Sequence, residues 1–596
     1  MSQIRNPFLT KECLNRLRQE MAKHHIALWY DHGSDPHLGE YIPEYWNTRQ
    51  WLSGFSGSAG KLVITQDFAG LWTDSRYFIQ AEKELMGTEF VLFRSGIPGV
   101  PSVEAFIFKN LPLHSVIGFN GKCIPAALVE IWANLFSEKS YKIKDDIDLV
   151  DQIWHDRPLL PMNPAFRYAL SYAGETSSQK IKRLREDLLV HHIDGMFIVL
   201  LDEIAWLLNI RGNDIPFSPL VLSYLWIDQQ KVVWFIDPKK VPNPLLKELT
   251  KEEIFCKPYS DVDKVLLSLC MGKHVSLDPT KISYHFAKII KKNSLQCKET
   301  ESPITHFKSI KNNTEQKGIQ QAHIRDGVAM VRWMVWLQNN LTKEHHTEYT
   351  IAEKLNAFRA KQPLFHDLSF STIVAYQENG AIVHYIPIKE SAVTVNPYGI
   401  LLVDSGGHYL DGTTDITRTL ALSEPTAEQK HFFTLVLKGL IHLSQVIFPE
   451  GSTGANLDSL ARQFLWQEGF NYGHSTGHGV GCFLTVHEGP QRISSTSMVP
   501  LKAGMLLSNE PGIYFEGNYG IRIENLMICQ PSSKKGYFAF KTVSLCPIDL
   551  SLVDTSLLTP DERHWLNAYH ATVCEKLSPH LSPKEKKWLK NQTRDI

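Results

Sequence analysis

The chain has 596 residues and a formal net charge of −1 at pH 7. Its length exceeds what one hydrophobic core usually serves, so about two to four domains are expected. A charge balance this close to zero argues against a nucleic-acid partner or an anionic membrane held by bulk electrostatics. The nine cysteines, an odd number without a Cys-x-x-Cys pair, predict reduced thiols rather than a disulfide framework.

The N-terminal segment, MSQIRNPFLTKE, lacks the apolar core of a signal peptide. The most apolar runs, such as residues 195–201, are far shorter than a membrane span and are followed by charge. We therefore expect a cytoplasmic protein without a membrane partner.

The first half of the chain contains an internal sequence repeat. Two short motifs recur in the same order and at a constant offset, namely Arg16-Leu17-Arg18 and His24-His25-Ile26, then Arg183-Leu184-Arg185 and His191-His192-Ile193. Each copy predicts an amphipathic helix followed by an apolar strand, which indicates a duplicated domain. The first copy has extra residues around 32–45, and its polar residues His32, Asp35 and His37 are expected on a surface loop.

Three regions follow from these patterns, with a proline-rich linker after the first. They cover residues 1–156, 157–308 and 309–596, the last with a C-terminal extension from about residue 548. The second region contains predicted strands at 232–236 and 275–277.

The third region mixes helix and strand patterns. Apolar residues at helical spacing predict a long helix through Ile324, Val328, Val331 and Val335. Strands are predicted at 400–404, 415–419, 505–509 and 521–527. Near the end, Thr559-Pro560-Asp561-Glu562 predicts a further helix start. The expected fold class is therefore α/β (α+β).

Acidic residues mark the ends of these strands. Asp404 closes one strand and Asp415 opens the next after a glycine-rich reversal, so a hairpin would return the second carboxylate beside the first. Glu510 follows an apolar strand and precedes a Pro-Gly turn. Glu524 is disfavoured by strand propensity, and alternation places Arg522 on its face. A residue that breaks strand propensity in an otherwise well-formed strand, as Glu524 does, indicates a functional role.

Histidines accompany these acids. His478 lies between Gly477 and Gly479, which leave its imidazole unobstructed. His474 precedes it in the same glycine-rich loop, and His487 follows it before Glu488-Gly489-Pro490. A zincin is excluded, because neither loop histidine belongs to a helical His-Glu-x-x-His motif.

One set of side chains predicts a two-metal site: Asp404, Asp415, His478, Glu510 and Glu524. Four carboxylates that converge without cations would repel one another, whereas two divalent cations neutralise them. An oxygen-rich set with one imidazole favours Mn²⁺ or a similar borderline-hard ion. Arg522 would orient and partly neutralise a ligand carboxylate.

This ordered set resembles the ligand pattern of the pita-bread metallopeptidases, which include methionine aminopeptidase, prolidase and Xaa-Pro aminopeptidase. The flanking segments are also similar, namely Asn379-Gly380-Ala381-Ile382-Val383-His384-Tyr385, Asp411-Gly412-Thr413-Thr414-Asp415, Gly477-His478-Gly479-Val480-Gly481, His487-Glu488-Gly489-Pro490 and Asn509-Glu510-Pro511-Gly512. Across nearly its whole length, the chain resembles the long, three-domain cytosolic Xaa-Pro aminopeptidases. The resemblance implies two related creatinase-like N-terminal domains, then a pita-bread catalytic domain with a short C-terminal extension.

The resemblance also implies ligand roles. Asp404 would bind one metal, Asp415 and Glu524 would bridge both, and His478 with Glu510 would complete the second. The usual metal is Mn²⁺, two per subunit, with Co²⁺, Zn²⁺ or Fe²⁺ as alternatives. A water or hydroxide between the metals would be the nucleophile, and Glu510 would take part in proton transfer.

By the same resemblance, His384, His474 and His487 would line the site, bind the substrate and stabilise the developing oxyanion. The implied substrate is a peptide with proline at position 2, hydrolysed between its first two residues. That bond is a tertiary amide without an N–H, which ordinary peptidases cleave poorly. A homodimer is implied as well.

Four alternatives remain at this stage. Prolidase uses the same ligands on Xaa-Pro dipeptides but generally has one N-terminal domain, so the duplicated first half counts against it. Methionine aminopeptidase usually lacks such N-terminal domains. Metal-free pita-bread binding or chaperone modules carry substitutions at the ligand positions, and this chain has none. The intact ligands also argue against the metal-independent creatine-hydrolase branch.

Overall fold

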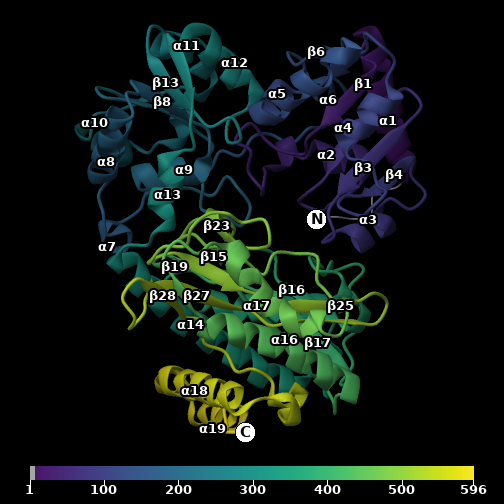
Figure 1. Ribbon diagram of the computed structural model, residues 1–596, viewed down its shortest axis with the longest axis vertical. Helices are drawn as coiled ribbons and strands as arrows, with labels where there is room; N and C mark the ends of the chain where they lie inside the picture. The colour runs from purple at the N-terminus through teal and green to yellow at the C-terminus, as the bar shows by residue number, and fades with distance from the viewer. Residues whose placement is uncertain (1–6) are drawn as a thin grey trace. The chain divides into compact units, whose positions relative to one another are not determined.

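The computed structural model describes residues 7–596 (Figure 1). Residues 1–6, which begin the segment expected to lack a signal peptide, lie outside the described residues. The chain forms two compact units. The first comprises residues up to Ala169 together with Glu175–Ile304, and the second comprises Leu170–Gly174 together with Thr305–Ile596. Across residues 7–596, no helix combines the length and the apolar character needed to cross a membrane.

The first unit contains two six-stranded sheets of the same topology. One sheet has the order β4-β3-β2-β1-β5-β6, and the other has the order β12-β11-β10-β8-β13-β14. The first sheet comprises β1 (Leu28–Asp31), β2 (Lys61–Ile64), β3 (Ala69–Thr73), β4 (Phe90–Arg94), β5 (Val116–Gly118) and β6 (Lys142–Lys144). The second comprises β8 (Gly195–Ile198), β10 (Tyr224–Asp228), β11 (Val232–Phe235), β12 (Ile254–Lys257), β13 (His274–Leu277) and β14 (Gln296–Glu299). The matching strand order confirms the predicted duplication.

The repeated segment lies at the start of each copy, in helices α1 (Pro7–Lys23) and α8 (Ser177–Val190). Each helix buries an apolar stripe, as an amphipathic helix must. The equivalent residues Leu17 and Leu184 are both 0% exposed. The strand that follows each helix pairs antiparallel with one neighbour and parallel with the other.

Two of the three polar residues expected on a surface loop in the insertion, Asp35 and His37, are buried, so that expectation was wrong for them. Asp35 is 0% exposed and His37 is 1% exposed. The Nδ1–H of His37 donates to the carbonyl of Val199 at 2.8 Å, directly after β8, and Nε2 lies 3.0 Å from the Tyr259 hydroxyl. The insertion therefore joins the first copy to the second. Polar composition did not reveal this burial, because the partners of the His37 ring lie in the second copy, more than 100 residues away.

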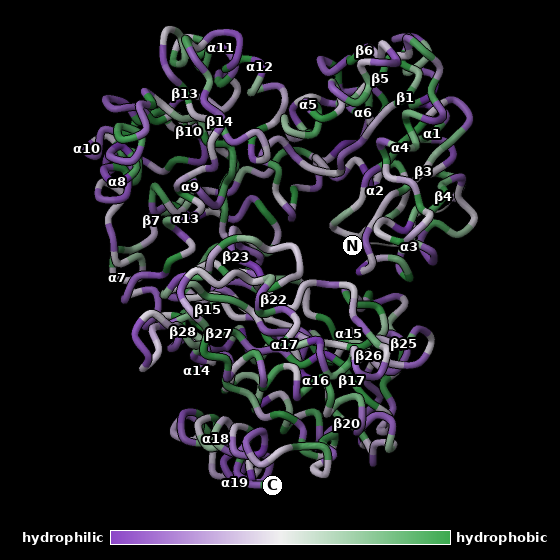
Figure 2. Tube along the Cα trace, viewed as in Figure 1, coloured by the Kyte–Doolittle hydropathy of each residue, from purple (hydrophilic) through white to green (hydrophobic). Residues whose placement is uncertain are grey.

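The second unit contains the predicted long helix, α14 (Asn313–Asn340), whose residues Val328 and Val331 are buried. It ends with α18 (Pro560–Leu577), which Thr559 caps as predicted, and α19 (Pro583–Gln592). Figure 2 shows hydrophilic residues along much of α19. Helices α16 (Ala427–Gln445) and α17 (Gly454–Trp466) lie side by side (Figure 1).

Two sheets of the second unit carry the predicted acids. The three-stranded sheet is β16 (Ile373–Tyr376), β17 (Ile400–Ser405) and β20 (Ile416–Ala421), in that order. The six-stranded sheet has the order β21 (Ile447–Pro449), β28 (Tyr537–Thr542), β27 (Asn525–Pro531), β24 (Leu506–Asn509), β22 (Gly477–Gly479) and β23 (Glu488–Ile493). β17 and β20 are antiparallel, with Asp404 opposite Thr417, which confirms the predicted return of the chain beside Asp404.

The strand predicted at 521–527 is two strands in the structure. β26 (Tyr519–Arg522) pairs with β25 (Gly512–Phe515), and β27 starts at Asn525, so Glu524 lies in a break between strands. Both residues of this break are buried, since Ile523 and Glu524 are 0% and 1% exposed. The backbone at the break bonds elsewhere: the N–H of Glu524 donates to the Thr417 carbonyl at 3.1 Å.

Candidate metal centre

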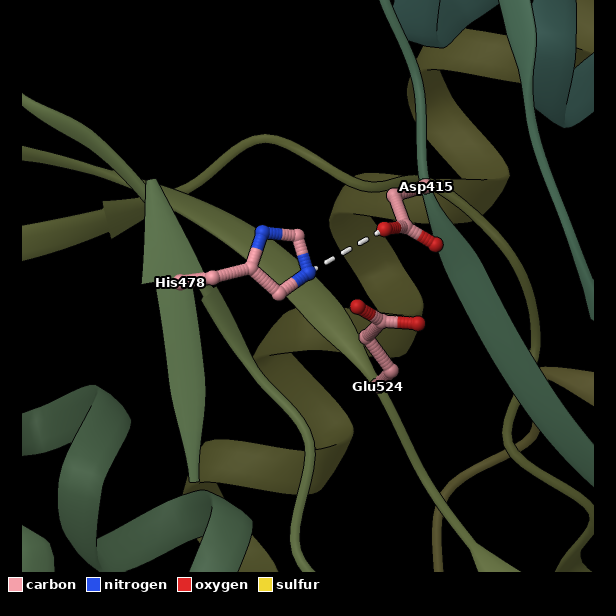
Figure 3. A group of neighbouring side chains, drawn as sticks. All are labelled: Asp415, His478 and Glu524. Carbon is pink, nitrogen blue, oxygen red and sulfur yellow. Dashed lines mark ion pairs between the residues drawn. The ribbon is translucent and has the colours of Figure 1, made fainter. Parts of the chain in front are cut away.

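Three of the predicted ligands converge on one point. Asp415, His478 and Glu524 each offer a ligand atom, and these atoms lie within 4.8 Å of one another. Figure 3 shows the three side chains directed toward each other, with His478 Nε2 3.4 Å from a carboxylate oxygen of Asp415. They come from the start of β20, from β22, and from the break between β26 and β27.

The other two predicted ligands lie beside this group but outside its 4.8 Å limit. Glu510 follows β24, and its Oε1 is 3.5 Å from His478 Nε2. Asp404 lies near the end of β17, where its Oδ2 accepts a hydrogen bond from Arg522 Nη2 at 2.8 Å. Burial raises the pKa of Asp404, of Glu510 and of Glu524, and the negative charge of Asp415 raises each of them further, so the acids form one electrostatic cluster.

Two carboxylates in this cluster each have one anchored oxygen and one unpartnered oxygen. Arg522 bonds Oδ2 of Asp404, and the Thr417 hydroxyl donates to Oε2 of Glu524 at 2.9 Å. Among the described residues, Oδ1 of Asp404 and Oε1 of Glu524 are buried without a hydrogen-bond partner. A buried carboxylate oxygen without a partner is costly. A bound cation would satisfy both, so the residues present fit a metal.

The orientation of His478 also fits a metal. Its Nδ1 lies 2.9 Å from the carbonyl of Gly479, which can only accept, so Nδ1 carries a hydrogen. Nε2 therefore faces Asp415 and Glu510 and is the ligand atom. The neighbouring glycines allow close packing of β22, since a Cβ on Gly477 would meet the Ser508 carbonyl oxygen at 2.0 Å.

The electrostatics of the cluster favour added positive charge. Burial, followed by the charges of Asp415 and Asp404, raises the pKa of Glu524 well above its ordinary value. Burial raises the pKa of Glu510 to about 7. Burial alone would lower the pKa of His478, but Asp415 and Glu510 outweigh it and raise that pKa to about 9. Divalent cations would relieve the repulsion that causes these shifts and displace the protons.

A line of hydrogen bonds leads from Asp404 to His474. Arg522 donates through Nη2 to Asp404 and through Nη1 to the Tyr514 hydroxyl, each at 2.8 Å. That hydroxyl lies 2.8 Å from Nε2 of His474, whose Nδ1–H donates to the Ser475 carbonyl. Tyr514 therefore accepts from Arg522 and donates to His474. The network fixes His474 and the Asp404 carboxylate relative to each other.

The remaining predicted histidines lie close to this network. The ring of His487 packs edge-on against that of His478, with centroids 4.3 Å apart. His384 is half-buried and follows Val383, whose carbonyl accepts from Arg522 Nη2 at 3.3 Å.

Three polar residues in the network were not predicted from the sequence: Thr417, Ser508 and Tyr514. The Ser508 hydroxyl accepts from the His478 N–H at 2.9 Å and donates to Glu510 Oε1 at 3.2 Å. Thr417 and Ser508 each lie two residues from a predicted ligand, so strand alternation could have identified them. No comparable spacing signal identifies Tyr514.

Four family models match the chain in order. The Creatinase/Prolidase N-terminal domain matches residues 14–153 and again, by a second model, residues 156–315. Metallopeptidase family M24 matches residues 317–531, and the C-terminal region of peptidase M24 matches residues 536–596.

Two curated relatives extend over nearly the full length. The chain is 40% identical to a probable Xaa-Pro aminopeptidase P of Laccaria bicolor, with 98% of this chain and 93% of the relative covered. It is 37% identical to Xaa-Pro aminopeptidase 1 of Dictyostelium discoideum, with both chains fully covered.

Two solved structures are informative. The X-prolyl aminopeptidase of Caenorhabditis elegans, described as a cytosolic enzyme with a di-nuclear active site, has a TM-score of 0.95 at 34% identity and covers 98% of this chain and 100% of its own. A Xaa-Pro dipeptidase of Bacillus anthracis, with a TM-score of 0.51 at 23% identity, covers 63% of this chain and 99% of its own, and shares the fold. The chain belongs to metallopeptidase family M24, within the group of full-length Xaa-Pro aminopeptidases.

Proposed function

We propose that this protein is a metal-dependent aminopeptidase that hydrolyses the bond between an N-terminal residue and a penultimate proline. The observation that carries the proposal is the convergence of Asp415, His478 and Glu524, beside two buried carboxylate oxygens, of Asp404 and of Glu524, that have no hydrogen-bond partner among the described residues. The full-length similarity to Xaa-Pro aminopeptidases supports this substrate class.

We propose two divalent ions per subunit, with Mn²⁺ as the first candidate because oxygen ligands dominate the set. Asp404 would bind one ion, Asp415 and Glu524 would bridge the two, and His478 with Glu510 would bind the second. When bound, such ions lower the pKa of water and supply a nucleophile at neutral pH.

The side chains around the metals have separate tasks in this proposal. Glu510, beside His478 Nε2, would take part in proton transfer at its carboxylate. His487 and His384 provide hydrogen bonds to the developing oxyanion and the substrate backbone. His474, which is hydrogen-bonded to the Tyr514 hydroxyl, would contact the proline side of the scissile bond. Arg522 keeps the Asp404 carboxylate oriented.

Further features of the proposal concern the whole chain. We propose the three-part division at 1–156, 157–308 and 309–596, a cytoplasmic location, and a homodimer. The cytosolic description of the C. elegans relative supports the location. Trp466 and Phe470 are 47% and 37% exposed on the second unit and provide apolar surface for a second copy.

The rival is prolidase, and substrate length separates the two activities. The test is hydrolysis of a matched Xaa-Pro-Xaa tripeptide and Xaa-Pro dipeptide, before and after chelation and Mn²⁺ re-addition. We expect metal-dependent release of the first residue from the tripeptide, with little turnover of the dipeptide. Preference for the dipeptide would assign the protein to the prolidases. Inactivity on both peptides without any bound metal would favour a binding module.

A further inference from the structure

A buried carboxylate outside the metal centre holds the segment that carries His384. Glu348 is the first residue of α15 (Glu348–Ala360), and it is 0% exposed. Its carboxylate accepts hydrogen bonds from four groups: Tyr376 N–H at 2.7 Å, Asn379 Nδ2 at 3.0 and 3.2 Å to the two oxygens, the Tyr385 hydroxyl at 2.5 Å and Val393 N–H at 3.3 Å. All four donors are neutral, and no lysine or arginine forms an ion pair with Glu348 within residues 7–596.

The four donors lie in or next to one segment of the chain, residues 377–392, which we call the excursion. Tyr376 ends β16 immediately before the excursion, and Val393 follows its last residue. Asn379 and Tyr385 lie inside it. The backbone N–H of Glu348 also donates to the Val393 carbonyl at 3.1 Å. One carboxylate therefore fixes the excursion at both ends and at two points within.

The excursion also packs closely against β26, which leads to Arg522. A Cβ on Gly520 would meet the Gly380 carbonyl oxygen at 1.8 Å, so the two backbones touch. The Val383 carbonyl accepts from Arg522 Nη2. His384 thus lies between Val383, bonded to the metal-centre arginine, and Tyr385, bonded to Glu348.

We propose that Glu348 and Tyr385 are positioning residues that act on the reaction through His384. Directional hydrogen bonds to a buried carboxylate fix a loop more sharply than apolar packing does. A displacement of about 1 Å in a group that contacts substrate can lower the rate by about 100-fold. The inference rests on the proposed function, because His384 is given its role there.

The test is a double-mutant cycle with Tyr385→Phe and His384→Ala, assayed on the Xaa-Pro-Xaa tripeptide with metal-loaded protein. Tyr385→Phe removes only the hydroxyl that bonds Glu348. We expect kcat to fall by about 10- to 100-fold, with unchanged metal content by elemental analysis. In the His384→Ala background, Tyr385→Phe should lower kcat by less than about twofold, because the residue through which it acts is absent.

The matched control is Tyr409→Phe. Tyr409 is a buried tyrosine in β18 (Gly407–Tyr409) whose hydroxyl donates to the Asp326 carboxylate at 3.0 Å, away from residues 377–392. The kcat of the Tyr409→Phe variant should stay within about twofold of wild type. Glu348→Gln provides a second variant and should reproduce the Tyr385→Phe loss, again without metal loss.

Several results would overturn the inference: wild-type kcat in Tyr385→Phe, losses that multiply with His384→Ala, or loss of metal together with activity. The last result would assign Glu348 and Tyr385 a purely structural role. These outcomes differ from a failure of the proposed function, in which wild-type protein itself would not cleave the tripeptide.

Discussion

At the scale of single residues, the candidate metal centre is marked by carboxylate oxygens that accept a hydrogen bond and carboxylate oxygens that do not. Arg522 and Thr417 each bond one oxygen, of Asp404 and of Glu524, and leave the other without a partner among the described residues. Glu524 has the stronger shift, since burial and neighbouring acids hold its pKa well above its ordinary value. Because the charged form of Glu524 is so unfavourable without a cation, we expect Glu524 to be essential for metal binding and activity.

Glu524→Gln should therefore abolish measurable turnover. Loss of an outer-shell partner alone typically costs about 10- to 100-fold in metal affinity or activity, so loss of a bridging ligand should exceed about 100-fold. Peptidase assay and elemental analysis of the purified variant would measure both effects. The exposed Glu516→Gln, in the neighbouring turn, should match wild type. Full activity with two bound metals in Glu524→Gln would remove it from the ligand set.

His487 should behave differently, because it contacts the ring of His478 without belonging to the ligand set. Removing one hydrogen-bond donor to an oxyanion typically lowers kcat by about 10²- to 10³-fold. We expect His487→Ala to show a loss of that size with near-normal metal content, measured by steady-state kinetics and elemental analysis. Simultaneous loss of both ions would instead make His487 a ligand.

At the scale of elements, the break between β26 and β27 is held by one arginine of β20. Arg418 is 1% exposed and donates to the carbonyls of Pro547 and Glu524 and to the Tyr569 hydroxyl of α18. It thereby joins the strand that begins beside Asp415, the break that carries Glu524, and the C-terminal helix.

Arg418→Met should destabilise the second unit by about 3 kcal/mol or more, because several buried acceptors would lose their donor at once. Chemical unfolding of the metal-loaded variant would measure this. Arg332→Met removes an arginine whose side chain is one-third exposed in α14, and it should change stability far less. A change below about 1 kcal/mol for Arg418→Met would show that the network is not needed for stability.

The sequence predicted the convergence of Asp415, His478 and Glu524 and most of the strands around them, because strand ends, acids and glycines are local signals. It did not predict the break at Glu524, since Ile521 to Asn525 alternates as a strand would. The pairing of Glu524 with Thr417 and Arg418, more than 100 residues away, decides the local structure there. Tyr514 and Glu348 were also missed, because their partners His474 and Tyr385 lie 40 and 37 residues away.

At the scale of the whole molecule, the first unit shows how a duplication became asymmetric. The two sheets share one strand order, yet the first copy inserts His37 at the carboxyl end of β8 in the second copy. Burial lowers the pKa of His37 from 6.5 to about 3, so the ring stays neutral in the folded protein.

This shift predicts a pH dependence of stability. The unfolded chain binds a proton on His37 below about pH 6.5, whereas the folded chain does so only near pH 3, so the stability contributed by His37 is lost as pH falls through this range. His37→Gln should be less stable than wild type at pH 7.5, and the difference should narrow toward pH 4. Thermal unfolding of both proteins across this range would measure it. A difference that stays constant with pH would contradict the neutral, buried state of His37.

The central claim is that two divalent cations held by Asp404, Asp415, His478, Glu510 and Glu524 make this chain an Xaa-Pro aminopeptidase. The most direct test is a titration of metal-free protein with Mn²⁺, in which bound metal and tripeptide hydrolysis are measured on the same samples. We predict no activity without metal and a plateau of activity at two bound ions per subunit. Full activity in metal-free protein, or with metal bound elsewhere in a variant that lacks these ligands, would contradict the account.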